Sequence, residues 1–377
     1  MPVEIRKVES RKDLKEFIYF ANNLYKGNKY YCPSLISDDY TTFNPQKNGA
    51  MDFCQWQAFL AYKDGKLAGR VMAIINPKAN ESWKVEQVRF GWIDFIDDEE
   101  VAKALLDTVA AWGKERGMKQ IVGPLGFTDF DPEGMLIEGF DRLATLTGLY
   151  NHPYYPRILE KLGFKKETDW VEYRITFPEE LPQKYYQFAD LIVKKYNLNV
   201  RKVSREMIDK ENYGRKFFKL INETYYKLYG FSVLNDKQID AYTKQYLSLL
   251  DTRMVSFVED DKGELIAAGI TMPDLSLALQ KCNGELFPTG WYHLLKAIFW
   301  KPCDTLDLLL MGVREDYRSR GLNAVIIADL YPRLKEMGFK YVETTAELET
   351  NDSIQAVWKN FEKEQHKRRR AYGKEIE

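Results

Sequence analysis

The strongest constraint on the fold is an internal repeat with an offset of 200 residues. Residues 59–76 show apolar alternation on both sides of an Asp-Gly turn, which predicts a β-hairpin, and residues 255–272 show the same pattern. An Ala-Gly pair begins at Ala68 in the first copy and at Ala268 in the second. Self-similarity at a fixed spacing indicates two copies of one structural unit.

Two further pairs of segments repeat in the same order. Residues 101–123 predict an amphipathic helix followed by a short strand, and residues 322–346 predict the same succession. Asn151 and Asn351, again 200 residues apart, are each expected to cap a helix that precedes a strand. Three element pairs in one order favour the duplication of a mixed α/β unit.

The length of 377 residues suits two domains. Apolar residues make up 45% of the chain, which is enough to form a core in each domain. Pro178 and Pro182 bracket an acidic turn between the copies. We therefore expect an N-terminal domain of residues 1–178 and a C-terminal domain of residues 183–377.

The offsets also locate two differences between the copies. The second copy has extra residues at 273–304, which predict a helical insertion with many aromatic side chains. The first copy has an extra segment at 124–150 that is rich in glycine. A connection of that length is often functional. Two roles stay open for it: it closes the substrate side of the second copy, or it covers the sheet of the first.

The charge and the cysteines exclude several classes of function. A net charge of −1 argues against a nucleic-acid partner, which would demand a broad basic surface. The basic run at 366–371 is interpreted as a solvated strand or tail. The four cysteines lack zinc spacing, so no metal is expected. No signal peptide and no membrane-spanning run are found, so we expect a cytoplasmic protein without a membrane partner.

The turn at 314–321 separates an apolar strand from an apolar helix. Such a turn directs free backbone N–H groups toward one point, where the helix dipole favours an anion. Gly321 allows close approach of the backbone to a phosphate, and Arg314, Arg318 and Arg320 supply countercharge. The equivalent turn of the first copy, at 97–100, carries four acidic residues instead. We therefore expect an anion pocket in the second copy and none in the first.

The sequence RSRGLNA at 318–324, after a strand that ends in Gly-Val, resembles the acyl-CoA pyrophosphate loop of the Gcn5-related N-acetyltransferase (GNAT) superfamily. The usual form of this loop is Arg/Gln-x-x-Gly-x-Gly/Ala. Arg318 and Gly321 match it, whereas Asn323 departs from the third position. By element order the whole chain is similar to a tandem GNAT protein. The resemblance implies an α/β fold in which each domain has a central mixed, mostly antiparallel sheet flanked by helices.

The resemblance also implies an acyl-CoA co-substrate, acetyl-CoA or a longer one, whose pantetheine arm enters a gap between the strands at 306–313 and 341–346. A backbone N–H in this gap would face the thioester oxygen. Asn351 either caps its helix alone or also contacts the arm. The residues expected to bind the co-substrate are Met311, Gly312, Val313, Arg318, Ser319, Arg320, Gly321, Leu322, Asn323, Ala324 and Asn351.

The catalytic groups are less well defined by the sequence. Acyl transfer to an amine requires a base, and Glu343 and Glu347 are the candidates near the gap. Many family members place a tyrosine seven residues after the asparagine that opens the last helix, to protonate the leaving thiolate. Trp358 occupies that position here. Water, or another tyrosine such as Tyr317 or Tyr331, would have to serve.

The sequence thus predicts an N-acyltransferase that uses acyl-CoA, with its donor site in the second copy. The alternative is an acyl-CoA-binding sensor or scaffold without turnover. A third hypothesis takes aminoacyl-tRNA or long-chain acyl-CoA as the donor, by analogy with other tandem relatives. The acceptor is expected to be a small-molecule or peptide amine, and the sequence defines neither the acceptor nor the oligomeric state.

Overall fold

The computed structural model describes residues 2–247, 250–300 and 302–377. Its strands are β1 (Glu4–Lys7), β2 (Gln55–Lys63), β3 (Lys66–Ile75), β4 (Gln87–Phe95), β5 (Gln120–Gly123), β6 (Met135–Glu138), β7 (Lys165–Thr176), β8 (Asn199–Arg201), β9 (Val255–Glu259), β10 (Leu265–Pro273), β11 (Thr305–Val313), β12 (Tyr341–Thr344), β13 (Glu347–Leu348) and β14 (Lys363–Glu375). Its α-helices are α1 (Arg11–Leu24), α2 (Ile36–Thr42), α3 (Pro77–Trp83), α4 (Glu99–Lys114), α5 (Tyr154–Lys161), α6 (Gln183–Tyr196), α7 (Arg205–Lys210), α8 (Tyr213–Tyr225), α9 (Asp236–Gln245), α10 (Ser276–Cys282), α11 (Gly290–Leu295), α12 (Leu322–Glu336) and α13 (Asp352–Val357).

Within the described residues, the strands form one continuous mixed sheet. Its order is β1-β2-β3-β4-β5-β14-β7-β12-β11-β10-β9-β8, with β6 beside β14 and β13 beside β7. The pairs β4–β5 and β11–β12 are parallel, and the other pairs described are antiparallel. The expected α/β class with a mixed, mostly antiparallel sheet and flanking helices is confirmed. The repeat is visible in the topology. From one edge of the sheet to its centre the order is β1 to β5 and then β14, and from the other edge it is β8 to β12 and then β7.

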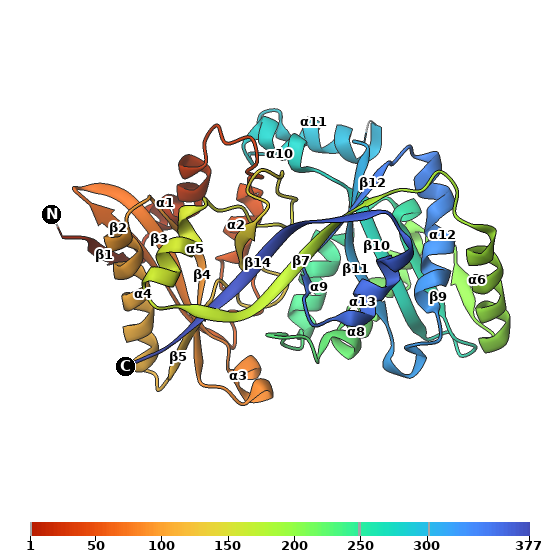
Figure 1. Ribbon diagram of the computed structural model, residues 1–377, viewed down its shortest axis with the longest axis horizontal. Helices are drawn as coiled ribbons and strands as arrows, with labels where there is room; N and C mark the ends of the chain where they lie inside the picture. Colours follow the sequence, from red (N-terminus) through yellow and green to blue (C-terminus); the bar gives the residue numbers. More distant parts are fainter. Residues whose placement is uncertain (1, 248–249, 301) are drawn as a thin grey trace.

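The two halves exchange their last strands. β7 belongs to the first half but pairs with β12 of the second, and β14 pairs with β5 of the first. β7 and β14 also pair with each other along most of their length and form the centre of the sheet. Figure 1 shows the result: the blue C-terminal strand crosses the molecule and ends among the orange elements of the first half. Strand pairing therefore crosses the expected boundary between residues 178 and 183.

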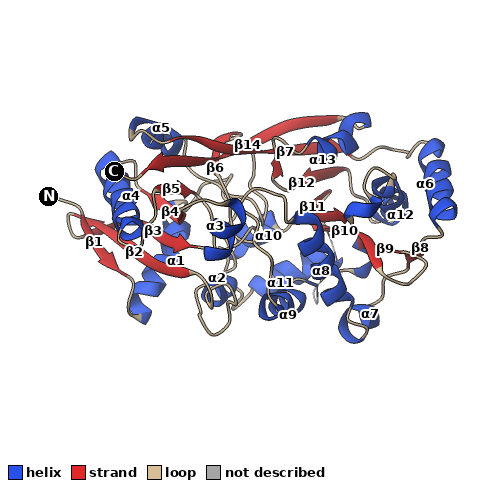
Figure 2. Cartoon of the chain, turned by 90° about the horizontal axis from the view of Figure 1, so that it is seen from below, coloured by secondary structure: helices blue, strands red, loops and turns tan. Residues whose placement is uncertain are grey.

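Alternation along the strands places one core on each face of the sheet. In β2, Phe59 and Ala61 pack in the cluster that contains α4, whereas Ala58 and Leu60 pack in the cluster that contains α1. In the second half, α12 and α6 cover one face of β9 to β11, and α8 covers the other. Figure 2 shows helices on both sides of the strands. The repeated hairpins and amphipathic helices predicted from the sequence are all present.

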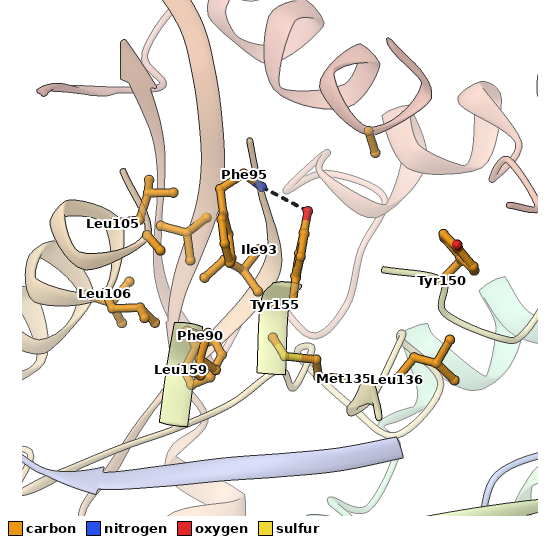
Figure 3. Close-up of a cluster of buried hydrophobic side chains, with 14 of the residues drawn as sticks. Phe90, Ile93, Phe95, Leu105, Leu106, Met135, Leu136, Tyr150, Tyr155 and Leu159 are labelled. Carbon is orange, nitrogen blue, oxygen red and sulfur yellow. Dashed lines mark hydrogen bonds between the residues drawn. The ribbon is translucent and has the colours of Figure 1, made fainter. Parts of the chain in front are cut away.

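The core of the first half is held by aromatic side chains from β4 and α5 (Figure 3). The ring of Tyr155 stacks on Phe95 with centroids 4.1 Å apart, and its hydroxyl accepts a hydrogen bond of 3.0 Å from the Phe95 backbone N–H. Leu105 and Leu106 of α4 pack against the same cluster. Each buried side chain of this size contributes about 1.5–3 kcal/mol to stability, so this cluster anchors α4 and α5 to the sheet.

The basic run near the C-terminus is not a solvated tail, and that expectation is wrong. It lies in β14 at the centre of the sheet, where His366, Lys367 and Arg369 are buried. Lys367 Nζ lies 3.5 Å from carboxylate oxygens of both Glu172 and Glu343, and Arg369 forms an ion pair with Glu172. Lys367 and Arg369 are thus neutralised by carboxylates inside the protein.

The segment at 124–150 packs on the first half and also contacts the second, while a role in closing a substrate site stays a prediction. It adds β6 to the edge of β14, and Leu125 and Phe127 pack in the core of the first half. The ring of Phe130 also packs against Phe218 of α8 and Tyr242 of α9 in the second half. The segment therefore joins the two halves on one face of the sheet.

Two local expectations have different outcomes. The helical insertion at 273–304 is confirmed, since it contains α10, α11 and a π-helical turn at Lys296–Trp300. The expected helix cap by Asn151 is wrong. α5 begins three residues later, and the Asn151 side chain accepts a 2.6 Å hydrogen bond from the Leu136 N–H instead. Among the described helices, none is both long and apolar enough to cross a bilayer.

Candidate functional site

The site begins where two parallel strands separate. β11 and β12 pair from Thr305 opposite Tyr341 to Leu308 opposite Thr344, and no pair follows. At the same point β11 has a bulge, because its register with β10 skips Leu309. Beyond the bulge β11 keeps β10 as its neighbour on one side and has no strand partner on the other. The separation expected between these strands is thus present, and Met311, Gly312 and Val313 lie on its β11 side.

The C-terminal end of β11 leads through the charged turn into α12. Ser319 and Gly321 both adopt left-handed backbone conformations, with φ of 61° and 85°. Among the described residues, no acceptor is found for the backbone N–H groups of Gly321, Leu322 and Asn323. The first bonded amide is that of Ala324, which donates to the Gly321 carbonyl at 2.9 Å. Three successive free donors at the start of a 15-residue helix form an anion-binding geometry.

The structure gives a different reason for glycine at position 321 from the one expected. A Cβ atom there would lie 2.6 Å from Ile192 Cδ1 and 2.8 Å from Phe188 Cε1, both on α6. The positive φ adds strain for any other residue except asparagine and aspartate. Gly321 is therefore required by the turn and by the packing of α6, in addition to any approach of a phosphate.

The three arginines of the turn have different partners. Arg314 is bound by Asp316 and Asp260, so its charge is already neutralised and the expected role in binding phosphate is not supported. Arg318 donates a 2.6 Å hydrogen bond to the Thr224 carbonyl, which fixes its guanidinium at the end of α8. Arg320 is exposed and lies over the rings of Tyr196 and Tyr317. Arg318 and Arg320 thus remain as countercharges beside the free amides.

The two candidate bases lie in contrasting environments. Glu343 is surrounded by basic side chains: Arg174 Nη1 is 2.7 Å away and His366 Nε2 is 2.7 Å away. Burial alone would raise the pKa of Glu343, but the contacts with His366, Lys367 and Arg174 hold it below its ordinary value. A carboxylate held in this way is a poor base. Its role as a candidate base is therefore not supported by its surroundings.

Glu347 has the properties that a base requires. It is buried on β13, and its Oε1 accepts a 2.8 Å hydrogen bond from the indole N–H of Trp358, while Oε2 has no partner among the described residues. Burial raises the pKa of Glu347 to about 7, despite the opposing effect of the Trp358 bond. A pKa near 7 is close to the optimum for proton transfer at neutral pH. Trp358 thus holds Glu347 in place instead of supplying a proton.

A tyrosine that the sequence did not single out lies at the gap. The Tyr225 hydroxyl, at the end of α8, donates a 3.1 Å hydrogen bond to the Met311 carbonyl. Burial raises the pKa of Tyr225 to about 12, to which the Glu347 carboxylate contributes. Tyr331 instead donates to the Pro178 carbonyl, and Tyr317 packs against arginines of the turn. The sequence could not point to Tyr225, because it lies 86 residues from Met311 along the chain.

Asp307 is a second residue that sequence reasoning missed. It lies on β11 directly opposite Glu343, is 1% exposed, and neither carboxylate oxygen has a hydrogen-bond partner among the described residues. Burial and the negative charges of Asp274 and Glu343 raise its pKa well above the ordinary value. It lies near the start of β11, at the opposite end of the strand from the anion-binding turn. A lone aspartate within an apolar strand was the available signal.

The remaining predicted residues are placed as follows. Leu322 is buried in the core beneath α12, whereas Asn323 and Ala324 are half-buried in its first turn. Asn351 occupies the cap position of α13, but its side chain does not bond the helix backbone; its Oδ1 accepts from Ser353 Oγ at 2.7 Å. α13 packs on the apolar cluster that contains Leu308 and Met311, next to the gap.

The corresponding gap of the first half is filled by the chain itself. β4 and β5 also separate after three parallel pairs, but the Leu125 N–H then donates a 3.0 Å hydrogen bond to the Phe90 carbonyl. The buried Arg89 side chain occupies the same place and donates to the Gly126 and Gly230 carbonyls. The helix that follows begins at acidic residues, with Asp98 as its cap.

Comparisons with known proteins agree with this geometry. No family model matches the chain. The chain is 29% identical to protein YghO of Escherichia coli (strain K12), over 99% of this chain and 95% of YghO. It is 25% identical to a protein named bacterial ceramide synthase from Caulobacter vibrioides (strain NA1000 / CB15N), over 98% of this chain and 96% of that protein.

Among solved structures, a tandem GNAT protein from the clavulanic acid biosynthesis pathway covers 100% of this chain and 99% of its own, with a TM-score of 0.55 and 9% identity. The chain has the tandem GNAT fold. This fold confirms the resemblance to a tandem GNAT protein that the sequence indicated.

Proposed function

We propose that this protein is an N-acyltransferase that takes an acyl group from acyl-CoA, acetyl-CoA or a longer homologue, and transfers it to an amine. The observation that carries the proposal is the coincidence of two features on β11. Free amides and arginines follow its C-terminal end, and its edge loses its partner just before them. A pyrophosphate fits the first feature and an extended amide-containing arm fits the second. The described residues contain no group of His, Cys, Asp or Glu side chains placed to hold a metal ion.

The residues at the gap can carry the proton transfers. An amine acceptor with a pKa near 10 arrives as an ammonium and must lose one proton before its nitrogen attacks the thioester carbon. As the C–N bond forms and the C–S bond breaks, the nitrogen loses a second proton and the sulfur gains one. In this proposal the ammonium loses its first proton to water before the attack, and Glu347 accepts the second proton from nitrogen as the C–N bond forms. Tyr225 donates its hydroxyl proton to the thiolate and recovers a proton from water.

The acceptor is proposed from the relatives and not from the site. A ceramide is the amide of a long-chain amino alcohol, so the name of the Caulobacter vibrioides relative describes the same class of reaction. Long-chain amino alcohols therefore come first in the panel of acceptors to be tested, followed by short amines and by peptides with free amino groups. Long-chain and short acyl-CoA are tested side by side as donors.

The donor site is tested by calorimetry with acetyl-CoA and palmitoyl-CoA. Asn323→Asp places a negative charge beside the free amides, where it favours the helix but repels a pyrophosphate. We expect binding to weaken about tenfold or more. Asn360→Asp, on an exposed turn of the same half, is the matched control and should bind like the original chain. Equal affinity of Asn323→Asp and the original chain would place the donor elsewhere.

Turnover is tested by release of the CoA thiol with each acceptor of the panel. We expect release above background with at least one amine. If either acyl-CoA binds but no amine supports thiol release, the transferase proposal is wrong and the chain is an acyl-CoA-binding protein without turnover.

A further inference from the structure

The insertion between β10 and β11 carries a set of exposed apolar side chains, three of which cluster: the ring of Tyr292 lies 6.2 Å from that of Trp291 and 6.0 Å from that of Trp300. Phe287 is 79% exposed and Trp300 is 64% exposed. Large apolar side chains that are this exposed mark contact surfaces when they gather in one place. The members of this set, called the aromatic platform below, are Leu277, Phe287, Trp291, Tyr292, Phe299 and Trp300. Figure 1 shows α10 and α11 at the upper rim of the molecule.

The aromatic platform is a rigid part of the fold. Its inward side chains Leu279, Leu294 and Ile298 are buried in the core of the first half. The Gln280 side chain donates to the Tyr31 carbonyl at 2.8 Å, and the Ile36 N–H donates to the Gly284 carbonyl at 3.0 Å. The apolar side chains on its outer face are therefore presented by an anchored element and do not depend on a mobile loop.

The exposed charged side chains next to the aromatic platform are basic. Between Ser276 and Trp300 the exposed ionisable side chains are Lys281 and Lys296. Glu285 is half-buried and accepts a 2.6 Å hydrogen bond from the Tyr19 hydroxyl. Tryptophan and tyrosine with flanking lysine are the side chains that concentrate at the boundary between lipid headgroups and acyl chains. A basic flank adds attraction to anionic lipids.

We propose that the aromatic platform docks the protein on the surface of a bilayer that contains anionic phospholipid. This is a peripheral contact and replaces the expectation that no membrane is involved. The proposal does not depend on acyl transfer. Docking would nevertheless affect how substrates reach the site. The aromatic platform precedes β11 in the chain, and the anion-binding turn follows β11. A nine-residue strand separates them by about 30 Å, so a membrane-bound amphiphile and acyl-CoA would approach from opposite ends.

Vesicle co-sedimentation tests the docking without any CoA. The full chain is mixed with vesicles of dioleoylphosphatidylcholine alone or of the same lipid with dioleoylphosphatidylglycerol. We expect binding to the second kind and at least tenfold weaker binding of Phe287→Ser/Trp300→Ser, because two large apolar side chains are lost. Leu191→Ser, an equally exposed apolar change on α6, is the matched control and should bind like the original chain. Lys281→Glu/Lys296→Glu should remove the preference for the anionic vesicles.

Contact depth is measured with brominated phosphatidylcholine mixed with the anionic lipid. Tryptophan fluorescence should be quenched in the original chain and much less in Trp291→Phe/Trp300→Phe, which keeps apolar side chains at both positions. No sedimentation with either vesicle overturns the proposal. Sedimentation that Phe287→Ser/Trp300→Ser leaves unchanged overturns it as well. A dimer of the full chain that this double substitution dissociates would instead identify the platform as a self-association surface. Loss of vesicle binding with intact calorimetric CoA binding separates this proposal from the transferase.

Discussion

Glu343 and Glu347 lie four residues apart on either side of the strand separation, and their neighbours give them opposite acid strength. Glu343 faces Arg174, His366 and Lys367, whereas the carboxylate of Glu347 is bonded by an uncharged indole. Two identical side chains thus have different pKa values because different groups surround them.

Replacement of Glu347 by glutamine should lower kcat about a hundredfold and change the pH profile. Burial raises the pKa of Glu347 to about 7, so the rate of the original chain should rise with pH through that value as the carboxyl group loses its proton. The variant should lack this rise. Thiol release measured from acidic to alkaline pH checks the prediction. The control Glu343→Gln should keep the rise in rate around pH 7. If Glu347→Gln also keeps this rise, the base is another group.

The same shift should affect stability. The pKa of Glu347 is about 7 in the folded chain and near the ordinary value of 4.5 after unfolding, so the folded chain binds more protons between these values. The free energy of unfolding contributed by this group should therefore decrease as pH rises from 4.5 to 7. Urea unfolding at several pH values should show a smaller decrease for Glu347→Gln than for the original chain.

Tyr225→Phe should lower kcat between about tenfold and a hundredfold while the affinity for acyl-CoA changes little, because the hydroxyl acts on the leaving sulfur. Tyr331→Phe removes a hydroxyl that bonds the Pro178 carbonyl and should leave kcat unchanged. Steady-state thiol release and calorimetry on both variants check this prediction. Equal loss in the two variants would exclude Tyr225 as the proton donor.

At the scale of the elements, β14 shows what a basic sequence can become in a folded protein. Lys367→Met should destabilise the chain by about 3 kcal/mol, because Glu172 and Glu343 stay buried with one cation fewer. Arg142→Met breaks an ion pair with Glu364, which also lies on β14. Both side chains are about half exposed, so this substitution should lower the free energy of unfolding by less than about 1 kcal/mol. Thermal unfolding of the two variants compares the two costs.

The sequence predicted the local elements well and their long-range partners poorly. The predicted hairpins and helices follow from local spacing, and the structure contains them. The partners of Lys367 are 195 and 24 residues away along the chain, and Tyr225 meets Met311 across 86 residues. No pattern within one segment specifies such contacts. The misread basic run and the missed Tyr225 arise from this limit, whereas Asp307 had a local signal as a lone aspartate within an apolar strand.

At the scale of the whole molecule, the exchanged strands make the two halves interdependent. A fragment of residues 1–180 lacks β14 and exposes the edge of β5, so it should aggregate or remain partly unfolded. Coexpression with residues 181–377 should restore a complex with the circular dichroism of the full chain. Size-exclusion chromatography of each fragment and of the pair checks the prediction. A monomeric, cooperatively unfolding 1–180 fragment would contradict it.

The exchange also sets an order of events during synthesis. β5 ends at Gly123 and its partner β14 begins at Lys363, so 240 further residues must be translated before the first half can complete its sheet. At typical elongation rates this takes roughly 10–50 s. Until then the β5 edge of the nascent chain has no strand partner. A chain that is terminated within the second half would lack β14, and its first half could not complete its sheet.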